Sequence, residues 1–384
     1  MSIAAVPDYL GKDFSSASPG LRFGMYLQVW EQGFTREKDK VAPLKRAGKL
    51  NDNDKKVMAA LAVRQQGAFD IIAANAESLQ LDAKSTAPFT TGLGNAHPLE
   101  NGFAFLNPYG LPYLAGSGVK GVLRQAAREL ASGEWGESDW TAADIIALFG
   151  PEPGADTLIR GALTFWDVLP RIQGDSLTVE IMTPHQQHYY QEGQSPHDSG
   201  QPVPISFLTV PPGSAFTFYM QCNLALLESS AAQLARDGKW RLLLQRAFEH
   251  AFNWLGFGAK TAVGYGAMQE DEEKKLEREQ QQAQQREQQR RATLSPAELA
   301  YEENRPAIEK LQQSFEQAKE APYQPGQEFD SKRAAFIQAA TTWDDQRSRS
   351  EAASLLEETL KWGVSKKGKD RLRAVVLELK KAKE

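Results

Sequence analysis

A glutamine-rich run that cannot bury a core by itself divides this chain of 384 residues into two parts. Seven of the ten residues 280–289 are glutamine, and Glu, Arg and Lys flank them. Because it has almost no apolar side chain to bury, the segment 271–294 is expected to be a solvated helix or a linker. We therefore expect separate folding units on its two sides.

The C-terminal part, residues 295–384, has the pattern of a small helical bundle. Ser295-Pro296-Ala297-Glu298 is a capping box with proline at the first helical position. Apolar residues then recur at helical spacing in four groups: Ile308, Leu311, Phe315 and Ala318; Phe336, Ile337, Ala340 and Trp343; Leu355, Leu356 and Leu360; and Leu372, Val375, Val376 and Leu379. Residues 361–384 hold nine basic and three acidic side chains, which predicts either a solvated face or contact with nucleic acid or an acidic neighbouring subunit.

Residues 78–270 alternate between strand-like and helix-like segments, which predicts an α+β domain. Strands are expected at Leu79–Ala83, Gly102–Leu106, Leu158–Leu169, Leu177–Met182, Ile205–Val210 and Ala215–Cys222. Helices are expected at Val119–Ala131 and within Ala225–Leu255. Residues 1–77 are expected to be mostly helical or irregular and to pack on this domain, with a strand-like segment at Leu21–Trp30 and a polar helix around Asp54–Ala76.

Composition excludes several classes of protein. Cys222 is the only cysteine, so neither an intramolecular disulfide framework nor a cysteine-rich metal site can form. No apolar run approaches the roughly 18–20 residues that span a bilayer, and Met1 to Phe14 lacks a signal-peptide pattern, so we expect a soluble cytoplasmic protein with no membrane partner. The net charge of −5 implies that any contact with RNA or DNA is a local stripe.

A glycine-rich segment, residues 256–266, contains Gly256, Gly258, Lys260, Thr261, Gly264 and Gly266. Glycine lets the backbone approach a ligand closely and leaves amides free to face an anion. Ala259 stands where a P-loop needs glycine before its lysine, and Thr261 fills a glycine position of the dinucleotide fingerprint. The segment therefore predicts a loop for a polyanion other than a mononucleotide.

A second glycine-rich turn, residues 112–124, runs into a helix. Gly116, Ser117 and Gly118 would expose amides at the positive helix terminus, where an anion is favoured. Lys120 and Arg124 are four residues apart, so they share a helix face and could follow successive phosphates. The alternative is a structural turn capped by Ser117, with two solvated cations.

Two histidines and two tyrosines are concentrated in one segment, at His185, His188, Tyr189 and Tyr190. The histidines could bind a metal with Glu180, or one could act as a general base in RNA cleavage, but no second partner stands at a diagnostic spacing. The aromatic rings could instead stack on bases, or pack within a loop. A third glycine-bearing loop, Gly92 to Gly102, is uninformative by itself, and Glu100 in it could accept a hydrogen bond from the neighbouring turn.

Taken in order, these segments resemble the RAMP superfamily, and within it the sixth-subunit family of the type III-B CRISPR Cmr effector complex. A Gly-Leu-Gly-Asn…Pro-Leu-Glu-x-Gly stretch is matched at Gly92 to Gly102, and a Pro-Tyr…Gly-Ser…Lys-Gly…Arg stretch at Pro112 to Arg124, with departures at Ala115 and Gly118. A Thr-Pro-His…Tyr-Tyr segment and a Pro-x-Pro…Phe…Val segment are matched at Thr183 to Tyr190 and Pro202 to Val210. The glycine-rich end is matched at Gly256 to Gly266, so the resemblance covers roughly residues 78–268.

The resemblance implies a ferredoxin-like sheet of the RNA-recognition-motif type, with helices on one face and a C-terminal helical extension outside the family. It implies a non-catalytic subunit that caps the backbone filament near the 3′ end of a guide RNA, with guide RNA, target RNA and other Cmr subunits as partners and no cofactor or metal. The two glycine-rich segments would contact guide phosphates through their amides, Lys120, Arg124 and Lys260. An insertion around residues 183–204, called the thumb in this family, would wedge into the guide–target duplex and place His185, His188, Tyr189 and Tyr190 near a base.

Two other functions stay open. One is a metal-independent endoribonuclease on a related RAMP fold that processes CRISPR RNA, with His185 or His188 as the base. Asp82, Asp167 and Asp198 are the candidates should the chain itself cleave target RNA. The other is a scaffold protein in which both glycine-rich segments are purely structural.

Overall fold

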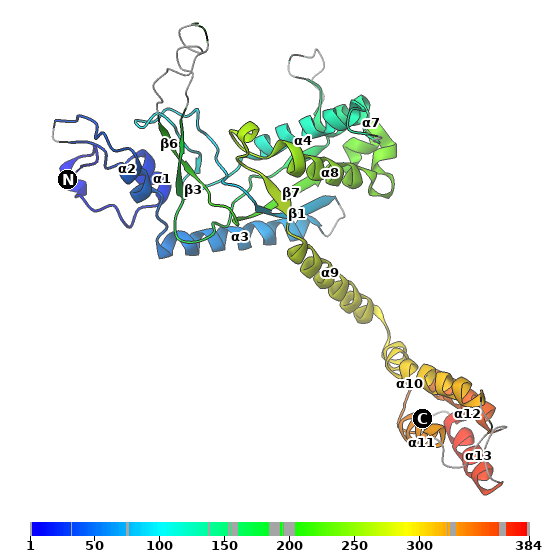
Figure 1. The fold of residues 1–384 in the computed structure, drawn as a ribbon. Helices are drawn as coiled ribbons and strands as arrows, with labels where there is room; N and C mark the ends of the chain where they lie inside the picture. Colours follow the sequence, from blue (N-terminus) through cyan, green and yellow to red (C-terminus); the bar gives the residue numbers. More distant parts are fainter. Residues whose placement is uncertain are drawn as a thin grey trace. The chain divides into compact units, whose positions relative to one another are not determined.

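The computed structural model of the protein describes residues 2–31, 33–73, 77–136, 139–152, 154, 160–183, 193, 195, 204–320, 322, 328–360 and 366–381. The chain forms two compact units, Met1–Leu276 and Glu277–Glu384 (Figure 1). The division falls inside helix α9 (Glu272–Thr293), six residues beyond the expected end of the sheet domain at residue 270.

A four-stranded antiparallel sheet forms the centre of the first unit. Its order is β4 (Leu163–Phe165), β7 (Ala215–Cys222), β1 (Ser78–Ser85) and β8 (Met268–Glu270). Helix α4 (Gly116–Ala131) connects β1 toward β4, and helix α8 (Lys239–His250) lies between β7 and β8. This βαββαβ order, with the first strand between the third and the fourth, is the ferredoxin-like arrangement. The predicted α+β ferredoxin-like fold is confirmed.

Helices cover both faces of this sheet. On one face, the ring of Phe218 in β7 lies 5.2 Å from that of Phe248 in α8. On the other face, helix α3 (Asp52–Ala73) crosses the sheet (Figure 1). The hydroxyl of Tyr219 donates a 2.8 Å hydrogen bond to Gln66 of α3, and its ring lies 4.7 Å from Phe69. The expectation of helices on one face is therefore wrong, and the face on which an RNA-recognition motif stacks bases is occupied by α3.

A separate two-stranded hairpin flanks the sheet. Strand β5 (Thr178–Met182) pairs with β6 (Ile205–Thr209) in antiparallel register from Thr178↔Thr209 to Met182↔Ile205. This hairpin frames the segment 183–204 that was expected to form the thumb. His185, His188, Tyr189 and Tyr190 lie outside the described residues.

Several expected elements change in extent or type. Leu21–Trp30 does not form a strand: helix α1 (Pro19–Gly24) begins there, because Pro19 sets the backbone of a first helical turn. Of the expected strand Leu158–Leu169, residues 158 and 159 lie outside the described part, and the rest contributes β4. Val168 does not pair with β7, because it exchanges backbone hydrogen bonds with Leu114. The expected strand Gly102–Leu106 contributes only β2 (Phe105–Leu106).

The first unit has further short elements: η1 (Asp8–Leu10), α2 (Val41–Ala47), β3 (Leu111–Pro112), α5 (Ala142–Phe149), α7 (Leu224–Ala235), η2 (Arg236–Gly238), η3 (Ala251–Leu255) and η4 (Thr261–Val263). None of the helices in the described part of the chain is apolar over a length that could cross a bilayer. Cys222 is buried at the end of β7, and burial raises the pKa of its thiol to about 12.

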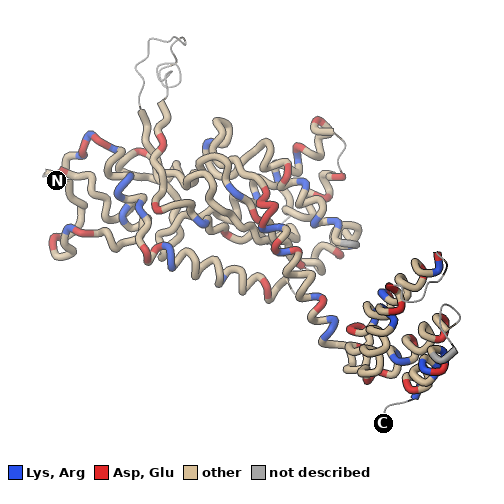
Figure 2. Tube along the Cα trace, turned by 60° about the horizontal axis from the view of Figure 1, so that its bottom comes forward, with Lys and Arg blue, Asp and Glu red and all other residues tan. Residues whose placement is uncertain are grey.

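Helix α9 is the glutamine-rich run, and none of its side chains is buried. Beyond it, the second unit is a bundle of α10 (Pro296–Lys319), α11 (Glu328–Ala340), α12 (Gln346–Thr359) and α13 (Lys366–Lys380). Ser295 and Glu298 form the predicted capping box. The bundle core is built from the predicted apolar groups, among them Leu311, Phe315, Phe336, Leu356 and Leu379. Both basic and acidic residues occur along these helices (Figure 2).

Candidate nucleic-acid interface

The start of α4 is packed tightly and already has an anion. A Cβ atom on Gly116 would overlap the carbonyl oxygen of Phe165, so glycine is required there. The Gly116 amide donates a 2.7 Å hydrogen bond to the carboxylate of Asp167. Ser117 does not cap the helix, since Ala115 is the N-cap residue and no side chain caps it. The positive terminus of α4 is therefore partly neutralised by a residue of this chain.

Lys120 and Arg124 have different surroundings on α4. Arg124 donates a 2.7 Å hydrogen bond to the carbonyl of Gly150 and lies 3.5 Å from Glu152, with its side chain only 14% exposed. Partial burial lowers the pKa of Lys120, and the cations of Arg124 and Arg160 lower it further. Arg124 is thus not a solvated cation, whereas Lys120 belongs to a local concentration of positive charge.

The loop 256–266 has a backbone that depends on its glycines. Gly256, Gly258, Gly264 and Gly266 all have positive φ, between 69° and 95°. A Cβ atom on Gly266 would overlap the carbonyl oxygen of Phe257, and one on Gly258 would overlap that of Thr90. These glycines are needed for close packing within the domain, which is a structural role independent of any ligand.

The same loop also presents donors toward its surroundings. No backbone carbonyl among the described residues accepts a hydrogen bond from the amides of Gly258, Thr261 or Ala262. Lys260 has a left-handed backbone with φ of 59°, which is uncommon for a residue other than glycine. No carboxylate in the described ranges forms an ion pair with Lys260. An ammonium group beside free amides is a suitable arrangement for a phosphate.

The side chain of Lys260 connects this loop to the base of the β5–β6 hairpin. Its Nζ lies 3.2 Å from the sulfur of Met182 and 5.7 Å from the centre of the Phe207 ring. The hydroxyl of Tyr265 lies 3.4 Å from the carboxylate of Glu180, and burial followed by this carboxylate raises the pKa of Tyr265. The predicted loop and the base of the predicted thumb are therefore in contact.

The third glycine-bearing loop contacts the N-terminal segment. The Glu100 carboxylate accepts a 2.5 Å hydrogen bond from Lys40, not from the neighbouring turn as expected. The ring of His97 stacks on Phe23 at 3.8 Å, and its Nε2 lies 3.0 Å from the carbonyl oxygen of Phe23. These contacts give the loop a structural role.

Two of the candidate catalytic carboxylates have hydrogen-bond partners within the domain. Asp82 accepts a 2.7 Å hydrogen bond from Thr217, and Asp167 holds the start of α4. Asp198 lies outside the described residues. Among the residues that are described, no group of three or more His, Cys, Asp or Glu side chains is placed to bind a metal.

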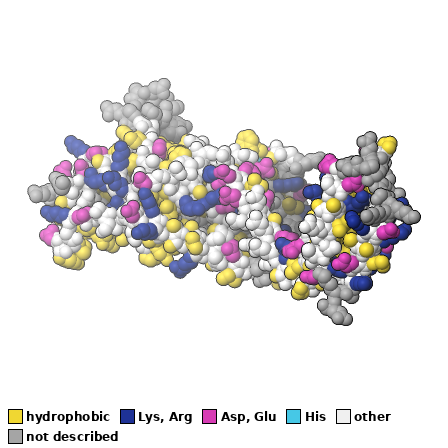
Figure 3. All heavy atoms as spheres, turned by 90° about the horizontal axis from the view of Figure 1, so that it is seen from below, with side chains coloured by type: hydrophobic (Ala, Val, Ile, Leu, Met, Phe, Trp, Pro, Cys, Tyr) yellow, Lys and Arg dark blue, Asp and Glu magenta, His cyan; other side chains and the backbone are white. Residues whose placement is uncertain are grey.

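Two tryptophans near the glycine loop were not predicted from the sequence as candidate site residues. Trp254 is 66% exposed and lies two residues before Gly256, and its ring is 4.9 Å from that of Trp135, which is 43% exposed. The position of a tryptophan directly before the glycine-rich segment is the sequence feature that could have indicated them. On the face shown in Figure 3, basic and acidic side chains are interspersed, in agreement with a local rather than a general electrostatic contact.

The sequence model of the RAMP superfamily matches residues 82–269, which include both glycine-rich segments and the β5–β6 hairpin. Among curated proteins, the chain is 27% identical over 241 residues to the CRISPR system Cmr subunit Cmr6 of Pyrococcus furiosus. This alignment covers 49% of the chain and 66% of the relative, so the chain spans just under two thirds of that relative's length.

Two solved structures are also similar. One is a cryo-EM structure of the type III-B Cmr-beta bound to cognate target RNA, with a TM-score of 0.42, 19% identity, and coverage of 60% of this chain and 69% of that chain. The other is the crystal structure of Cmr6 from Pyrococcus furiosus, with a TM-score of 0.28, 24% identity, and coverage of 50% and 97%.

Proposed function

Since residues 82–269 of the chain are a domain of the RAMP superfamily, we propose that the protein is a non-catalytic RNA-binding subunit of a type III-B CRISPR antiviral effector complex. In this role it caps the backbone filament near the 3′ end of the guide RNA. Its partners are the guide RNA, the target RNA and the other subunits of the Cmr complex. The sequence similarity to a Cmr subunit supports this proposal.

The observation that carries the RNA-binding role is the surroundings of Lys260. Lys260 belongs to the same loop as Gly258, Thr261 and Ala262, whose amides donate to no described backbone carbonyl, and its ammonium has no ion pair with any described carboxylate. A phosphate of the guide can take all of these donors at once. Because Lys260 also contacts the base of the β5–β6 hairpin, that phosphate is held where the thumb begins.

The test is the binding of guide RNA by Lys260→Gln, which keeps a polar, slightly shorter side chain and removes its charge. A charge-assisted bond to phosphate contributes roughly 1.5–3 kcal/mol, so we expect affinity at low salt to fall about tenfold to a hundredfold. The loss should be equal for guides of different sequence and smaller at high salt. Lys239→Gln is the matched control, because this exposed lysine is the first residue of α8, a helix about 18 Å long whose other end leads toward the glycine-rich loop.

Unchanged guide affinity of Lys260→Gln at low salt would remove this loop from the RNA path. The endoribonuclease alternative makes a different prediction. A nuclease would cleave CRISPR repeat RNA as the purified chain, in the presence of a chelator, and His185→Ala or His188→Ala would abolish the cleavage. In the subunit role, both substitutions leave target cleavage by the assembled complex within a few-fold of the wild-type rate.

A further inference from the structure

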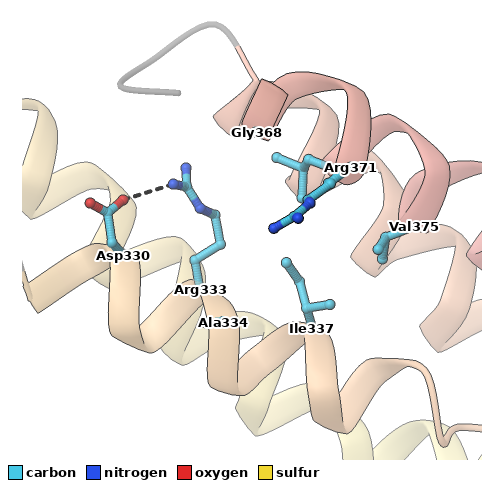
Figure 4. Close-up of a pocket in the computed structure, with 8 residues that line it drawn as sticks. Asp330, Arg333, Ala334, Ile337, Gly368, Arg371 and Val375 are labelled. Carbon is cyan, nitrogen blue, oxygen red and sulfur yellow. Dashed lines mark hydrogen bonds and ion pairs between the residues drawn. The ribbon is translucent and has the colours of Figure 1, made fainter. Parts of the chain in front are cut away.

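A cavity of about 380 Å³ lies in the C-terminal bundle, between α11 and α13. Each helix lines it with residues at spacings of three, four and seven, which places them on one helix face. The lining residues are Asp330, Arg333, Ala334 and Ile337 on α11, and Gly368, Arg371, Leu372 and Val375 on α13 (Figure 4). The two helices therefore present facing stripes to a shared space.

Two guanidinium groups face this space. Arg333 is 9% exposed, its Nη2 donates a 2.7 Å hydrogen bond to Asp330, and its guanidinium lies over the Phe329 ring at 5.2 Å. The Nη1 atom of Arg333 is buried and has no hydrogen-bond partner. A buried donor without an acceptor is unfavourable, so an acceptor that reaches this guanidinium is stabilised.

Arg371 is exposed on the opposite helix, and its side chain reaches from α13 over Ile337 (Figure 4). It forms no ion pair with any carboxylate in the described part of the chain. One buried and one exposed guanidinium thus face the same space. The only carboxylate of the described lining, Asp330, is hydrogen-bonded to the buried one, Arg333. The two arginines and one aspartate of the lining leave an excess of positive charge, and the guanidinium of Arg371 is a planar donor that suits a carboxylate.

The rest of the lining is apolar. Ile337 and Val375 are half-buried, and Leu372 is buried in the bundle core. Phosphates of RNA are strongly hydrated and come with a polar ribose, so these walls do not suit them. A carboxylate beside an apolar side chain satisfies both the guanidinium groups and the walls, as a peptide segment does when Asp or Glu is next to Leu.

We propose that the groove between α11 and α13 binds an acidic peptide segment of a protein partner, with its carboxylate between Arg333 and Arg371 and an apolar side chain against Ile337 and Val375. Charge complementarity argues for this occupant, because the described lining holds Arg333 and Arg371 against a single acidic residue, Asp330. The proposal does not depend on RNA binding by the first unit.

The test uses the full chain with labelled methyl groups and follows the NMR signals of Ile337 and Val375. The probe is a capped tetrapeptide, Ala-Leu-Asp-Ala, compared with the same peptide carrying Asn in place of Asp. We expect saturable shifts with the Asp peptide and at least tenfold weaker binding of the Asn peptide. Arg371→Gln should weaken the Asp peptide about tenfold, because one charge-assisted bond is lost. Arg373→Gln is the control, since Arg373 is exposed on the same helix and paired with Asp370.

Three outcomes would overturn the proposal. In the first, the Asp peptide gives no saturable shift of either methyl signal. In the second, the Asp and Asn peptides bind equally well, so that the carboxylate contributes nothing. In the third, inorganic phosphate or a ten-nucleotide uridine RNA displaces the peptide at equal concentration, which would make the groove a phosphate site.

Discussion

The carboxylate of Asp167 lies at the start of α4, where the sequence analysis predicted a phosphate of RNA. It accepts the hydrogen bond of the Gly116 amide, so this amide is satisfied without a ligand. A guide phosphate at this helix would therefore rely on the side chain of Lys120 rather than on the Gly116 amide. This contact stays a proposal.

Substitution of Lys120 and Arg124 tests the cations of α4. We expect Lys120→Ala to weaken guide RNA binding at low salt about tenfold or more, with little change in the free energy of unfolding. Arg124→Ala should also lower the free energy of unfolding by about 1–3 kcal/mol, since it leaves the Gly150 carbonyl without its donor. Binding at two salt concentrations and thermal denaturation separate the two effects. If Lys120→Ala and the double variant bind like the wild type, the phosphate path lies elsewhere.

His97 gives the first unit a dependence on pH. Burial lowers the pKa of His97 below its usual value of 6.5, while the hydrogen bond to Phe23 opposes this shift. The unfolded chain therefore binds a proton more readily than the folded one, and stability rises with pH in this range. His97 contributes fully above about pH 6.5, and its contribution is lost as the pH falls through the folded-state pKa. The measurement is urea denaturation at pH 7.5 and 5.5. Between these pH values, the free energy of unfolding should fall less in His97→Gln than in the wild type. An equal fall in both proteins would assign the pH dependence to other groups.

At the scale of elements, regular strands and helices were predictable where an apolar pattern marked them. Strand β7 begins and ends as predicted, and α4 begins three residues earlier than expected. Helix α3 was expected as a helix, but its cover of the second sheet face was not. Val57, Met58 and Leu61 of α3 pack against the core, but Val63 and Ile71 are exposed, so the apolar residues of α3 do not mark a single face. The contact to Tyr219 is made by a polar residue, Gln66.

The candidate site was predictable only in part, for the same reason. The segment that contains Lys260 was recognised from its glycines and its single cation. Which amides are free depends on residues far away in the sequence, since the carbonyl of Thr90 accepts from Ala259 and that of Pro88 accepts from Gly266. The side chain of Asp167 satisfies Gly116 in the same manner. Such pairings are set by tertiary packing and leave no local pattern.

Substitutions at two glycines of the 256–266 loop distinguish the cost of backbone strain from the cost of steric overlap. Both Gly264 and Gly266 have positive φ, but a Cβ atom on Gly264 meets nothing within 4 Å, whereas one on Gly266 overlaps the Phe257 carbonyl. We expect Gly264→Ala to cost roughly 1–2 kcal/mol of unfolding free energy. Gly266→Ala should cost about 4 kcal/mol or more. Chemical denaturation measures both; similar costs would mean that the loop moves to accept the methyl group.

At the scale of the whole molecule, the two units should fold independently, because α9 buries none of its side chains. A chain ending at Leu276 retains the buried Asp271, whose amide donates to the Asp82 carbonyl and whose carboxylate pairs with Lys84 at 3.2 Å. It also retains the ion pair of Lys275 with Glu270. We expect residues 1–276 to unfold at the same midpoint as the first unit of the full chain. A chain ending at Glu270 should be less stable by about 1–3 kcal/mol.

The shortened chain also tests the role of the bundle. We expect residues 1–276 to bind guide RNA like the full chain but to assemble with the other subunits in lower yield, because the groove between α11 and α13 is lost. Calorimetry, RNA titration and co-purification report these properties separately. An insoluble 1–276 chain would mean that the bundle is part of one core, and an unchanged yield of the complex would leave the bundle as a solubilising extension.

The single thiol of the chain has a practical consequence. Cys222 is buried at the β4–β7 pairing, and its pKa of about 12 leaves almost no thiolate in the native state near neutral pH. Alkylating reagents can therefore reach and react with it only when that part of the sheet opens. The rate at which Cys222 is alkylated therefore reports how often this part of the first unit opens. A cysteine introduced at an exposed position of the bundle can be labelled with a dye under native conditions, where Cys222 does not react. Distance measurements on this protein therefore do not require the removal of Cys222.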